Sequence, residues 1–245
     1  MMKFQTIQSI PYFQYIDSPL CIAGVSTRNG GISKGVYSSM NLGTHTADNP
    51  THVQHNRQLF FGTIAPGFTV AYMRQTHSNI VLNVDSDFVN DTEGDAFYTT
   101  KKGVLLTVSL ADCGSVIIHD DSYSLIAAIH CGWRGVHSQI IEKTISELSA
   151  YVKPEKLTAY IGPTIQQQYY EVGKEFLDLF PHSYFKENGE KLYFNLNGRI
   201  EDVLLESGVG MIMNSRMGTF AVPEHFYSYR RDGATGRFCA FIGIV

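Results

Sequence analysis

The chain lacks the clustered lysines and arginines that nucleic-acid-binding surfaces carry. Its 245 residues contain 19 Lys and Arg against 23 Asp and Glu, which gives a formal net charge of −4. Binding to nucleic acid depends on clustered cations that displace the counterions of the phosphates. The chain also lacks an apolar run of the ~20 residues that a membrane-spanning helix requires. We therefore predict neither a nucleic-acid partner nor insertion into a membrane.

Cysteine is scarce, and its four occurrences form no CxxC pair: Cys21, Cys113, Cys131 and Cys239. Scattered cysteines of this kind are typical of buried, catalytic or metal-binding thiols in a reducing compartment, rather than of disulfides. The amino-terminal segment lacks a charged region followed by an apolar stretch, which is the pattern of a signal peptide. These features predict a cytoplasmic protein.

The composition is that of an ordinary globular protein, with 44% hydrophobic and 17% charged residues. No linker, repeat or low-complexity tract divides the chain. Strand-like segments come in runs, and helical segments are interposed irregularly, which is typical of α+β proteins. We predict one catalytic domain over residues 1–245, of the α+β class, with a mixed β-sheet core and flanking helices.

Short apolar runs bounded by turn residues predict the strands. The strands are Val70–Met73, Val104–Leu110, Val116–Ile118, Leu125–Ile129, Leu157–Ile161 and a closing strand within Arg237–Val245. Apolar residues at helical spacing predict three helices. One runs from Pro50 to about Gly62, one amphipathic helix covers Val136 to Tyr151, and one includes Ile200 and ends near Gly208.

Three of the predicted strands lead to a side chain that can bind a metal ion. His77 follows the first strand, Cys113 follows the second, and His130 stands at the end of Leu125–Ile129. A thiolate with two imidazoles suits Zn²⁺, and three protein ligands leave a fourth position for water or substrate. The pattern favours these three residues as a metal-binding catalytic centre, although packed Cys and His residues at strand ends have the same spacing.

Eight segments carry a resemblance to a known family. They are STRNGGIS (26–33), SSMNLGTH (38–45), MRQTHS (73–78), EGDAFYT (93–99), ADCGSVIIHD (111–120), AAIHCGWRG (127–135), YIGPTI (160–165) and SYRRDGATGR (228–237). In these segments the chain resembles the YfiH-type purine nucleoside phosphorylases, formerly called the multicopper polyphenol oxidase or laccase-domain family. The resemblance implies a YfiH-like fold and zinc binding by His77, Cys113 and His130.

Two positions depart from the family pattern. Cys131 stands where the family commonly has Ala, and Gly114-Ser115 stands where it often has Pro. Because neighbouring side chains of a strand point to opposite faces, we expect Cys131 to pack away from His130. The absent proline leaves the three ligands intact but removes a source of stiffness from their loop.

The resemblance also implies an activity. It implies phosphorolysis of purine nucleosides such as adenosine, inosine and methylthioadenosine, with adenosine deamination as an associated activity. The partners are then a purine nucleoside and phosphate, and the cofactor is zinc, with copper as the less favoured alternative.

Further candidate residues lie in the same segments. The candidates for substrate binding are Arg28, Asn41, His45, Arg74, Asp112 and Arg134. Arginines offer planar pairs of donors to phosphate oxygens, and Arg230 is a further one of this kind. Asp95 and Asp112 are acceptors suited to orienting a ligand histidine or to acid–base chemistry. Trp133 is predicted either to pack in the core or to form a wall of the pocket.

Three other functions fit the same residues. A metal-free cysteine hydrolase or deamidase would use Cys113 as nucleophile and His130 as base. A copper-dependent polyphenol oxidase would need HxH pairs, which the sequence lacks. A non-enzymatic receptor would bind nucleoside without turnover. Metal analysis separates the first of these from the zinc enzyme.

Overall fold

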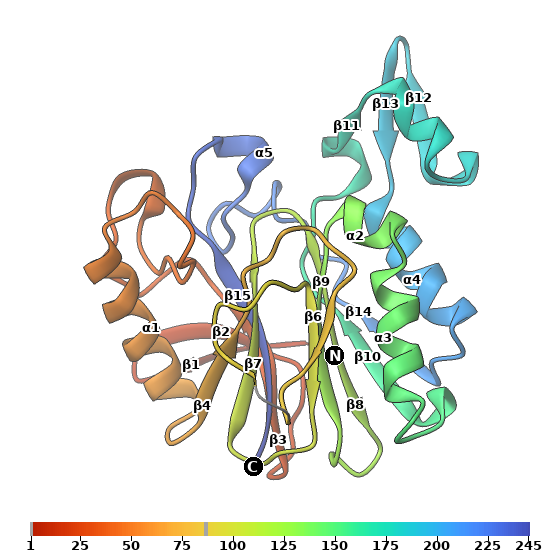
Figure 1. Ribbon diagram of the computed structural model, residues 1–245. Helices are drawn as coiled ribbons and strands as arrows, with labels where there is room; N and C mark the ends of the chain where they lie inside the picture. Colours follow the sequence, from red (N-terminus) through yellow and green to blue (C-terminus); the bar gives the residue numbers. More distant parts are fainter. Residues whose placement is uncertain (1, 86–87) are drawn as a thin grey trace.

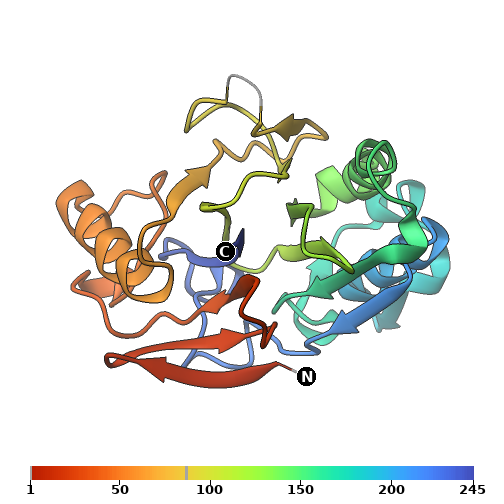
Figure 2. The same ribbon diagram turned by 90° about the horizontal axis from the view of Figure 1, so that it is seen from below.

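Two six-stranded sheets pack face to face, and helices cover the outer face of each (Figures 1 and 2). The structure is a computed structural model that describes residues 2–85 and 88–245. Viewed from below in Figure 2, the layers follow one another as helix, sheet, sheet and helices. This arrangement confirms the predicted α+β class, but two mixed sheets replace the single mixed sheet that we expected.

The first sheet contains the first three strands of the chain and its last strand. Its strand order is β1-β2-β3-β15-β7-β4. All neighbours are antiparallel except β4 and β7, which are parallel. The bounds are β1 (Lys3–Ile7), β2 (Ile10–Gln14), β3 (Cys21–Ser26), β15 (Phe238–Ile244), β7 (Val104–Leu110) and β4 (Thr69–Tyr72).

The second sheet is formed by the middle of the chain, in the order β14-β10-β8-β9-β6-β5. Its outermost pairs are parallel and its inner pairs antiparallel. The bounds are β14 (Met211–Asn214), β10 (Leu157–Ile161), β8 (Gly114–Asp120), β9 (Ile126–Cys131), β6 (Ala96–Thr99) and β5 (Val81–Asn83). A small third sheet projects beyond it in Figure 1, with β11 (Glu171–Val172), β13 (Lys191–Phe194) and β12 (Phe185–Asn188).

Helices lie outside the two sheets or, for the last of them, at the end of the sheets (Figure 1). They are α1 (Pro50–Ile64), α2 (Trp133–His137), α3 (Ile140–Leu148), α4 (Leu196–Glu206) and α5 (Tyr229–Asp232). Short 3₁₀ segments are η1 (Gly35–Tyr37), η2 (Pro154–Lys156), η3 (Gln167–Tyr169), η4 (Lys174–Asp178) and η5 (His182–Tyr184). No helix of the described ranges combines the length and apolar character needed to cross a bilayer.

The alternation of side chains along the strands divides the core into three clusters. In β9, Ala128 faces the interior between the two sheets, whereas Ala127 and Ile129 face the helices α3 and α4. On the first sheet, Phe241 of β15 packs with Phe60 of α1. The period of two therefore assigns each strand residue either to the space between the sheets or to a helix-covered face.

One predicted helix is wrong: the segment from Val136 to Tyr151 does not form a single helix. The helix α2 ends at His137, and Gln139 adopts a left-handed conformation with φ of 66° before α3 begins. The freed carbonyl of Ser138 accepts a hydrogen bond from the Asn79 side chain at 2.8 Å. The apolar spacing continued through the break, so the sequence pattern did not reveal it.

Candidate metal centre and substrate pocket

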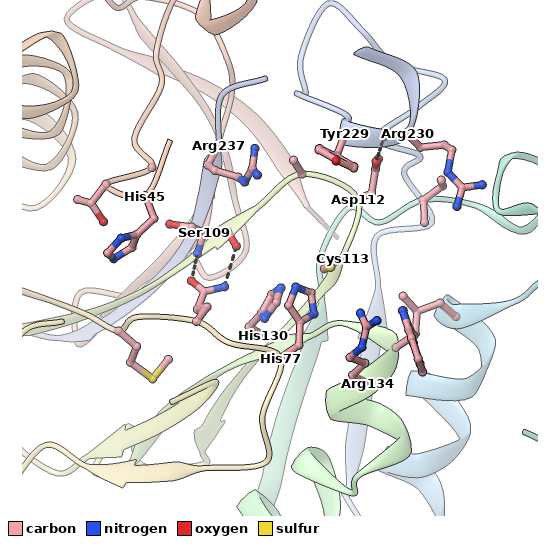
Figure 3. A pocket seen from close by; sticks show the side chains of 18 of the residues that line it. His45, His77, Ser109, Asp112, Cys113, His130, Arg134, Tyr229, Arg230 and Arg237 are labelled. Carbon is pink, nitrogen blue, oxygen red and sulfur yellow. Dashed lines mark hydrogen bonds between the residues drawn. The ribbon is translucent and has the colours of Figure 1, made fainter. Parts of the chain in front are cut away.

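The side chains of His77, Cys113 and His130 converge at one end of the two sheets (Figure 3). Their potential ligand atoms all lie within 4.8 Å of one another. The two imidazole rings meet edge to face, with centroids 4.9 Å apart and an interplanar angle of 70°. The three residues come from the loop after β4, the turn between β7 and β8, and the end of β9. The structure thus brings together the three residues that the strand-end pattern selected.

A pair of hydrogen bonds fixes the segment that carries His77. The Gln75 side chain donates from Nε2 to the carbonyl of Ser109 at 2.9 Å and accepts from the Ser109 amide at 2.7 Å. Ser109 lies in β7, which leads directly to Cys113. This two-point contact therefore holds the loop of one ligand against the strand of another (Figure 3).

Asp112 shapes the turn that presents Cys113. Its backbone is left-handed, with φ of 95°. Its carboxylate accepts hydrogen bonds from the Thr219 hydroxyl and the Arg230 amide, both at 2.6 Å. Its carbonyl accepts from the Thr164 hydroxyl at 2.8 Å. Asp112 lines the pocket, but these contacts make it an anchor of the turn.

Asp95 is the acceptor that organises both histidines. The Nδ1 atom of His130 lies 2.7 Å from its carboxylate, which also accepts from the amides of Thr76, His77 and Ser78 at 3.2, 3.1 and 2.6 Å. A carboxylate behind an imidazole fixes both the orientation and the tautomer of the ring. Asp95 therefore has the orienting position that we expected for it.

The two imidazoles have opposite proton affinities. Burial, followed by the charge of His130, lowers the pKa of His77 to about 4. Burial opposes the charged form of His130, but Cys113 and Asp95 outweigh it and raise the pKa of His130 to about 9. Burial likewise opposes the carboxylate of Asp95, yet hydrogen bonds from His130 and Ser78 lower its pKa to about 2. In the metal-free chain the cluster thus favours a neutral imidazole at His77 and a protonated imidazole at His130, which faces a carboxylate.

The cluster fits a bound metal ion. The Nδ1 atom of His77 is buried without a hydrogen-bond partner among the described residues. Buried polar nitrogens normally have a partner, so a lone pair left free in this position suits a cation. A side chain at Gly132 would overlap the His77 ring and approach Cys113 Sγ. Imidazole nitrogens and thiolate sulfurs are donors that zinc commonly binds in proteins.

The two departures from the family pattern are accommodated in the core. Cys131 is buried among the apolar residues under the helices, on the face of β9 opposite His130, as predicted. Gly114 lies against the Ile200 side chain of α4, and a Cβ there would be 2.6 Å from its Cδ1 atom. The close approach of this helix occupies the space that a larger residue would need.

A cavity of about 450 Å³ opens above the cluster, a volume suited to a small molecule. Its lining includes the predicted residues His45, Asp112, Arg134 and Arg230. Trp133 also lines it and packs on Phe176, with ring centroids 4.8 Å apart, so it serves both the pocket and the core. The sequence interpretation missed several lining residues: Gln75, Ser109, Ile165, Tyr170, Leu196, Tyr229 and Arg237.

Arg28 and Arg74 lie outside the pocket lining, and both have partners within the protein. The Arg28 guanidinium donates twice to the Ser38 carbonyl, at 3.1 and 3.0 Å, and lies 4.6 Å above the Tyr227 ring. Arg74 is exposed and faces Glu93 at 3.5 Å. Both are accounted for by local structure, which motif membership alone did not disclose.

Asn41 also lies outside the pocket lining, whereas His45 lies within it. The buried Asn41 side chain accepts from the amides of Gly43 and Arg237 at 3.1 and 2.8 Å and so ties two loops together. His45 is exposed at the pocket rim, with its Nε2 atom 2.7 Å from Asp91. Asn41 therefore shapes the rim from behind, and His45 lies on it.

Comparison with known proteins identifies the family. The family described as multi-copper polyphenol oxidoreductase laccase matches residues 22–245. An Escherichia coli (strain K12) protein named purine nucleoside phosphorylase YfiH is 33% identical over 226 residues, which are 90% of this chain and 92% of that protein. Purine nucleoside phosphorylase YlmD of Bacillus subtilis (strain 168) is 31% identical over 247 residues, covering 91% of this chain and 88% of its own. The crystal structure of YlmD from Geobacillus stearothermophilus superposes with a TM-score of 0.90 at 29% identity, covering 100% of this chain and 99% of that chain. The resemblance is confirmed: the chain belongs to this laccase-like family, together with the proteins named YfiH and YlmD.

Proposed function

We propose that this chain is a zinc-dependent purine nucleoside phosphorylase. The observation that carries the proposal is the convergence of His77, Cys113 and His130 at the floor of a cavity. The relatives named purine nucleoside phosphorylase support the same reaction class. We further propose that residues 1–245 act as one catalytic domain, because the pocket draws on both sheets and on loops from His45 to Arg237.

The residues of the pocket have different proposed roles in the reaction. His77, Cys113 and His130 would hold the zinc ion, which supplies Lewis acidity toward an oxygen of water or phosphate. Asp95 holds His130 in one orientation through its Nδ1 atom. Aromatic and aliphatic side chains offer apolar surface to a purine base: Trp133, Ile165, Tyr170 and Leu196. Arginines in the lining supply positive charge for phosphate.

The substrates that we propose are adenosine, inosine and methylthioadenosine, together with inorganic phosphate. Adenosine deamination is proposed as an associated activity, because a Lewis-acidic metal beside a purine pocket can also activate water. The mixed apolar and cationic lining supports a ligand that has both a flat base and an anionic partner.

One observation favours the rival cysteine hydrolase. Cys113, His130 and Asp95 form a chain of contacts in which a base lies between a thiol and a carboxylate. Such a triad does not require a second imidazole, yet the half-buried His77 lies against His130, and its buried Nδ1 atom has no partner among the described residues. The metal centre uses all three side chains, and we therefore prefer it.

A copper-based polyphenol oxidase is less favoured by the ligand set. In residues 2–85 and 88–245, only one group of three potential ligands converges. A multi-copper cluster requires many more imidazoles, usually in HxH pairs. We therefore propose zinc as the native metal and a single site.

Elemental analysis coupled to a nucleoside assay tests the proposal. We expect about one zinc per chain and release of free base from adenosine only when phosphate is present. His77→Ala and Cys113→Ala should each lose metal and turnover but keep the far-UV circular dichroism of the parent. Full activity in a variant that has lost its zinc would overturn the proposal. Absence of metal together with rapid alkylation of Cys113 would favour the hydrolase.

A further inference from the structure

Three arginines of the pocket lack a carboxylate partner. Arg134, Arg230 and Arg237 all line the cavity, and none forms an ion pair with the described acidic residues. Four arginines outside the pocket do face a carboxylate: Arg74, Arg199, Arg216 and Arg231. Arg28 and Arg57 also lack an ion pair, but they lie outside the cavity and donate to the backbone carbonyls of Ser38 and Leu42. Three arginines without a carboxylate partner thus share this one cavity.

Arg237 is the most constrained of the three. Its Nη1 atom donates to the carbonyls of Thr235 and Gly236 at 2.8 and 2.9 Å, which fixes the plane of the guanidinium. Its aliphatic stem packs against Gly43, where even a Cβ would collide with it. The Nε and Nη2 atoms have no partner among the described residues. Arg237 therefore presents a fixed pair of unused donors to the cavity (Figure 3).

The charge of Arg237 is costly unless a ligand compensates it. Burial of the side chain lowers the pKa of Arg237, which reflects the penalty on its charged form. A guanidinium remains charged despite such a shift. A partly buried cation without a counter-ion destabilises the protein unless an anion approaches it. The structure is consistent with a cation held in place for an anionic ligand.

Arg134 faces the same region from the other side of the metal cluster. Its guanidinium stacks on Trp133 at 4.3 Å from the ring centroid and has no hydrogen-bond acceptor among the described residues. Figure 3 shows Arg237 and Arg134 approaching His77 from two sides.

Arg230 is less suited to this role. Its Nη1 atom donates to the carbonyl of Glu171 at 2.7 Å, and its guanidinium lies 5.2 Å from the Tyr170 ring centroid. Its amide is also bound to the carboxylate of Asp112. These contacts direct Arg230 toward the small third sheet at the rim of the pocket.

We propose that Arg237 and Arg134 form a two-sided subsite for a tetrahedral oxyanion beside the His77–Cys113–His130 cluster, with Arg237 as the residue that orients it. The ligand is inorganic phosphate, so the inference rests on the proposed function and assigns its phosphate position. The paired donors of Arg237 match two oxygens of one phosphate, whereas Arg134 neutralises charge from the opposite side.

Isothermal titration calorimetry of the purified full chain with inorganic phosphate tests this assignment. Arg237→Gln should weaken phosphate binding about 10- to 100-fold, because it removes charge-assisted hydrogen bonds. Arg237→Lys keeps the charge but loses the planar fork, and should weaken binding several-fold. Arg134→Gln should weaken binding by a similar or smaller factor. The matched control Arg216→Gln removes an exposed arginine outside the cavity and should leave phosphate affinity unchanged.

The outcomes separate this inference from the reaction itself. Equal phosphate affinity in Arg237→Gln and Arg216→Gln, or no phosphate binding by the parent chain, would overturn the subsite. If Arg237→Gln does not fold, as judged by circular dichroism, the Lys variant decides, and parental affinity in it would also overturn the assignment. Arginine-dependent phosphate binding without release of a base from nucleosides would preserve the subsite and reject the proposed phosphorylase.

Discussion

The missing side chain of Gly132 leaves the space that the His77 ring occupies. A Cβ at this position would overlap the ring and come within 3.3 Å of Cys113 Sγ. We expect Gly132→Ala to displace His77 and to reduce both metal content and activity at least tenfold, because ligands displaced by about 1 Å lose their geometry. Metal analysis and the nucleoside assay measure both effects.

A second glycine provides the control for this variant. Gly62 lies in α1 with no atom near the position of a Cβ. We expect Gly62→Ala to keep metal and activity and to stabilise the fold by about 0.5–1 kcal/mol. Full metal content in Gly132→Ala would show that His77 is not confined by this glycine.

The proton on His130 predicts a pH dependence of metal uptake. With a pKa of about 9, His130 is protonated at pH 7 in the metal-free chain, and a ligand nitrogen must lose its proton to bind zinc. Zinc uptake at pH 7 should therefore release at least one proton, and affinity should rise from about pH 6.5 to pH 9. Calorimetry in buffers of different ionisation enthalpy counts the protons released.

Substitutions of Asp95 and Asp120 provide the test variant and its matched control for the proton-release experiment. Asp95→Asn removes the carboxylate that stabilises the imidazolium, so fewer protons should be released and zinc affinity should fall about 10- to 100-fold. Asp120 also accepts backbone amides, at the far end of β8, and Asp120→Asn should leave proton release unchanged. Identical proton release in both variants would contradict the role of Asp95.

The raised pKa of His130 also makes the stability of the metal-free chain depend on pH. A raised pKa means that the folded, metal-free chain gains stability from protonated His130, fully below about pH 6.5. This contribution is lost as the pH rises through about 9. The stability of the metal-free chain should therefore fall over that window, the opposite direction to zinc affinity.

At the scale of the elements, the break between α2 and α3 is a point of backbone strain. Gln139 has φ of 66°, a left-handed conformation that costs a residue with a Cβ about 1–2 kcal/mol. We expect Gln139→Gly to raise the free energy of unfolding by about 0.5–1 kcal/mol, measured by urea denaturation. As a control, Lys143→Gly inside α3 should lower it by about 1 kcal/mol. A loss of stability in both variants would mean that the segment is helical throughout.

Sequence patterns predicted several of the strands that are buried on both faces, although the buried strand β6 was missed. The runs Val104–Leu110 and Leu157–Ile161 match β7 and β10 residue for residue, because such strands are continuously apolar. The edge strands β1 and β12 were not predicted, since most of their residues are exposed and carry no apolar signal. The contrast is not complete, because the edge strand β4 was predicted within one residue, whereas the central strand β2 was not.

The metal cluster was predictable for a related reason. Each ligand follows or ends a predicted strand, so three local signals pointed to one end of the fold. The role of Arg237 depends instead on the pairing of β15 with β7 and on the packing of its stem against Gly43. Arg28 and Arg74 lie in motif segments, but both are bound by local partners outside the pocket. Motif membership alone does not reveal which arginines face the pocket. Long-range contacts decide such roles, and one sequence does not display them.

At the scale of the whole molecule, the cluster joins the two sheets. His77 follows a strand of the first sheet, His130 belongs to the second, and Cys113 lies in the turn that connects them. A metal ion bound by all three would cross-link the sheets at this end. With zinc at about 100 times its dissociation constant, the linkage is worth about 2.7 kcal/mol.

Chelation should therefore lower the melting temperature by about 5–10 °C, given about 2–4 °C per kcal/mol at this chain length. Calorimetric scans with zinc and with chelator measure the shift. His77→Ala should melt at one temperature under both conditions. If the chelator leaves the melting temperature of the parent chain unchanged, the cluster does not join the sheets through a metal.

The distribution of thiols has a consequence for oxidative damage. Cys21, Cys131 and Cys239 are buried, whereas Cys113 is partly accessible at the pocket floor. Oxidants from solvent thus reach a single cysteine thiol, that of Cys113, before any other. A metal ion bound to Cys113 would protect its sulfur from peroxide. The metal-free protein should therefore be inactivated by peroxide faster than the metal-bound protein.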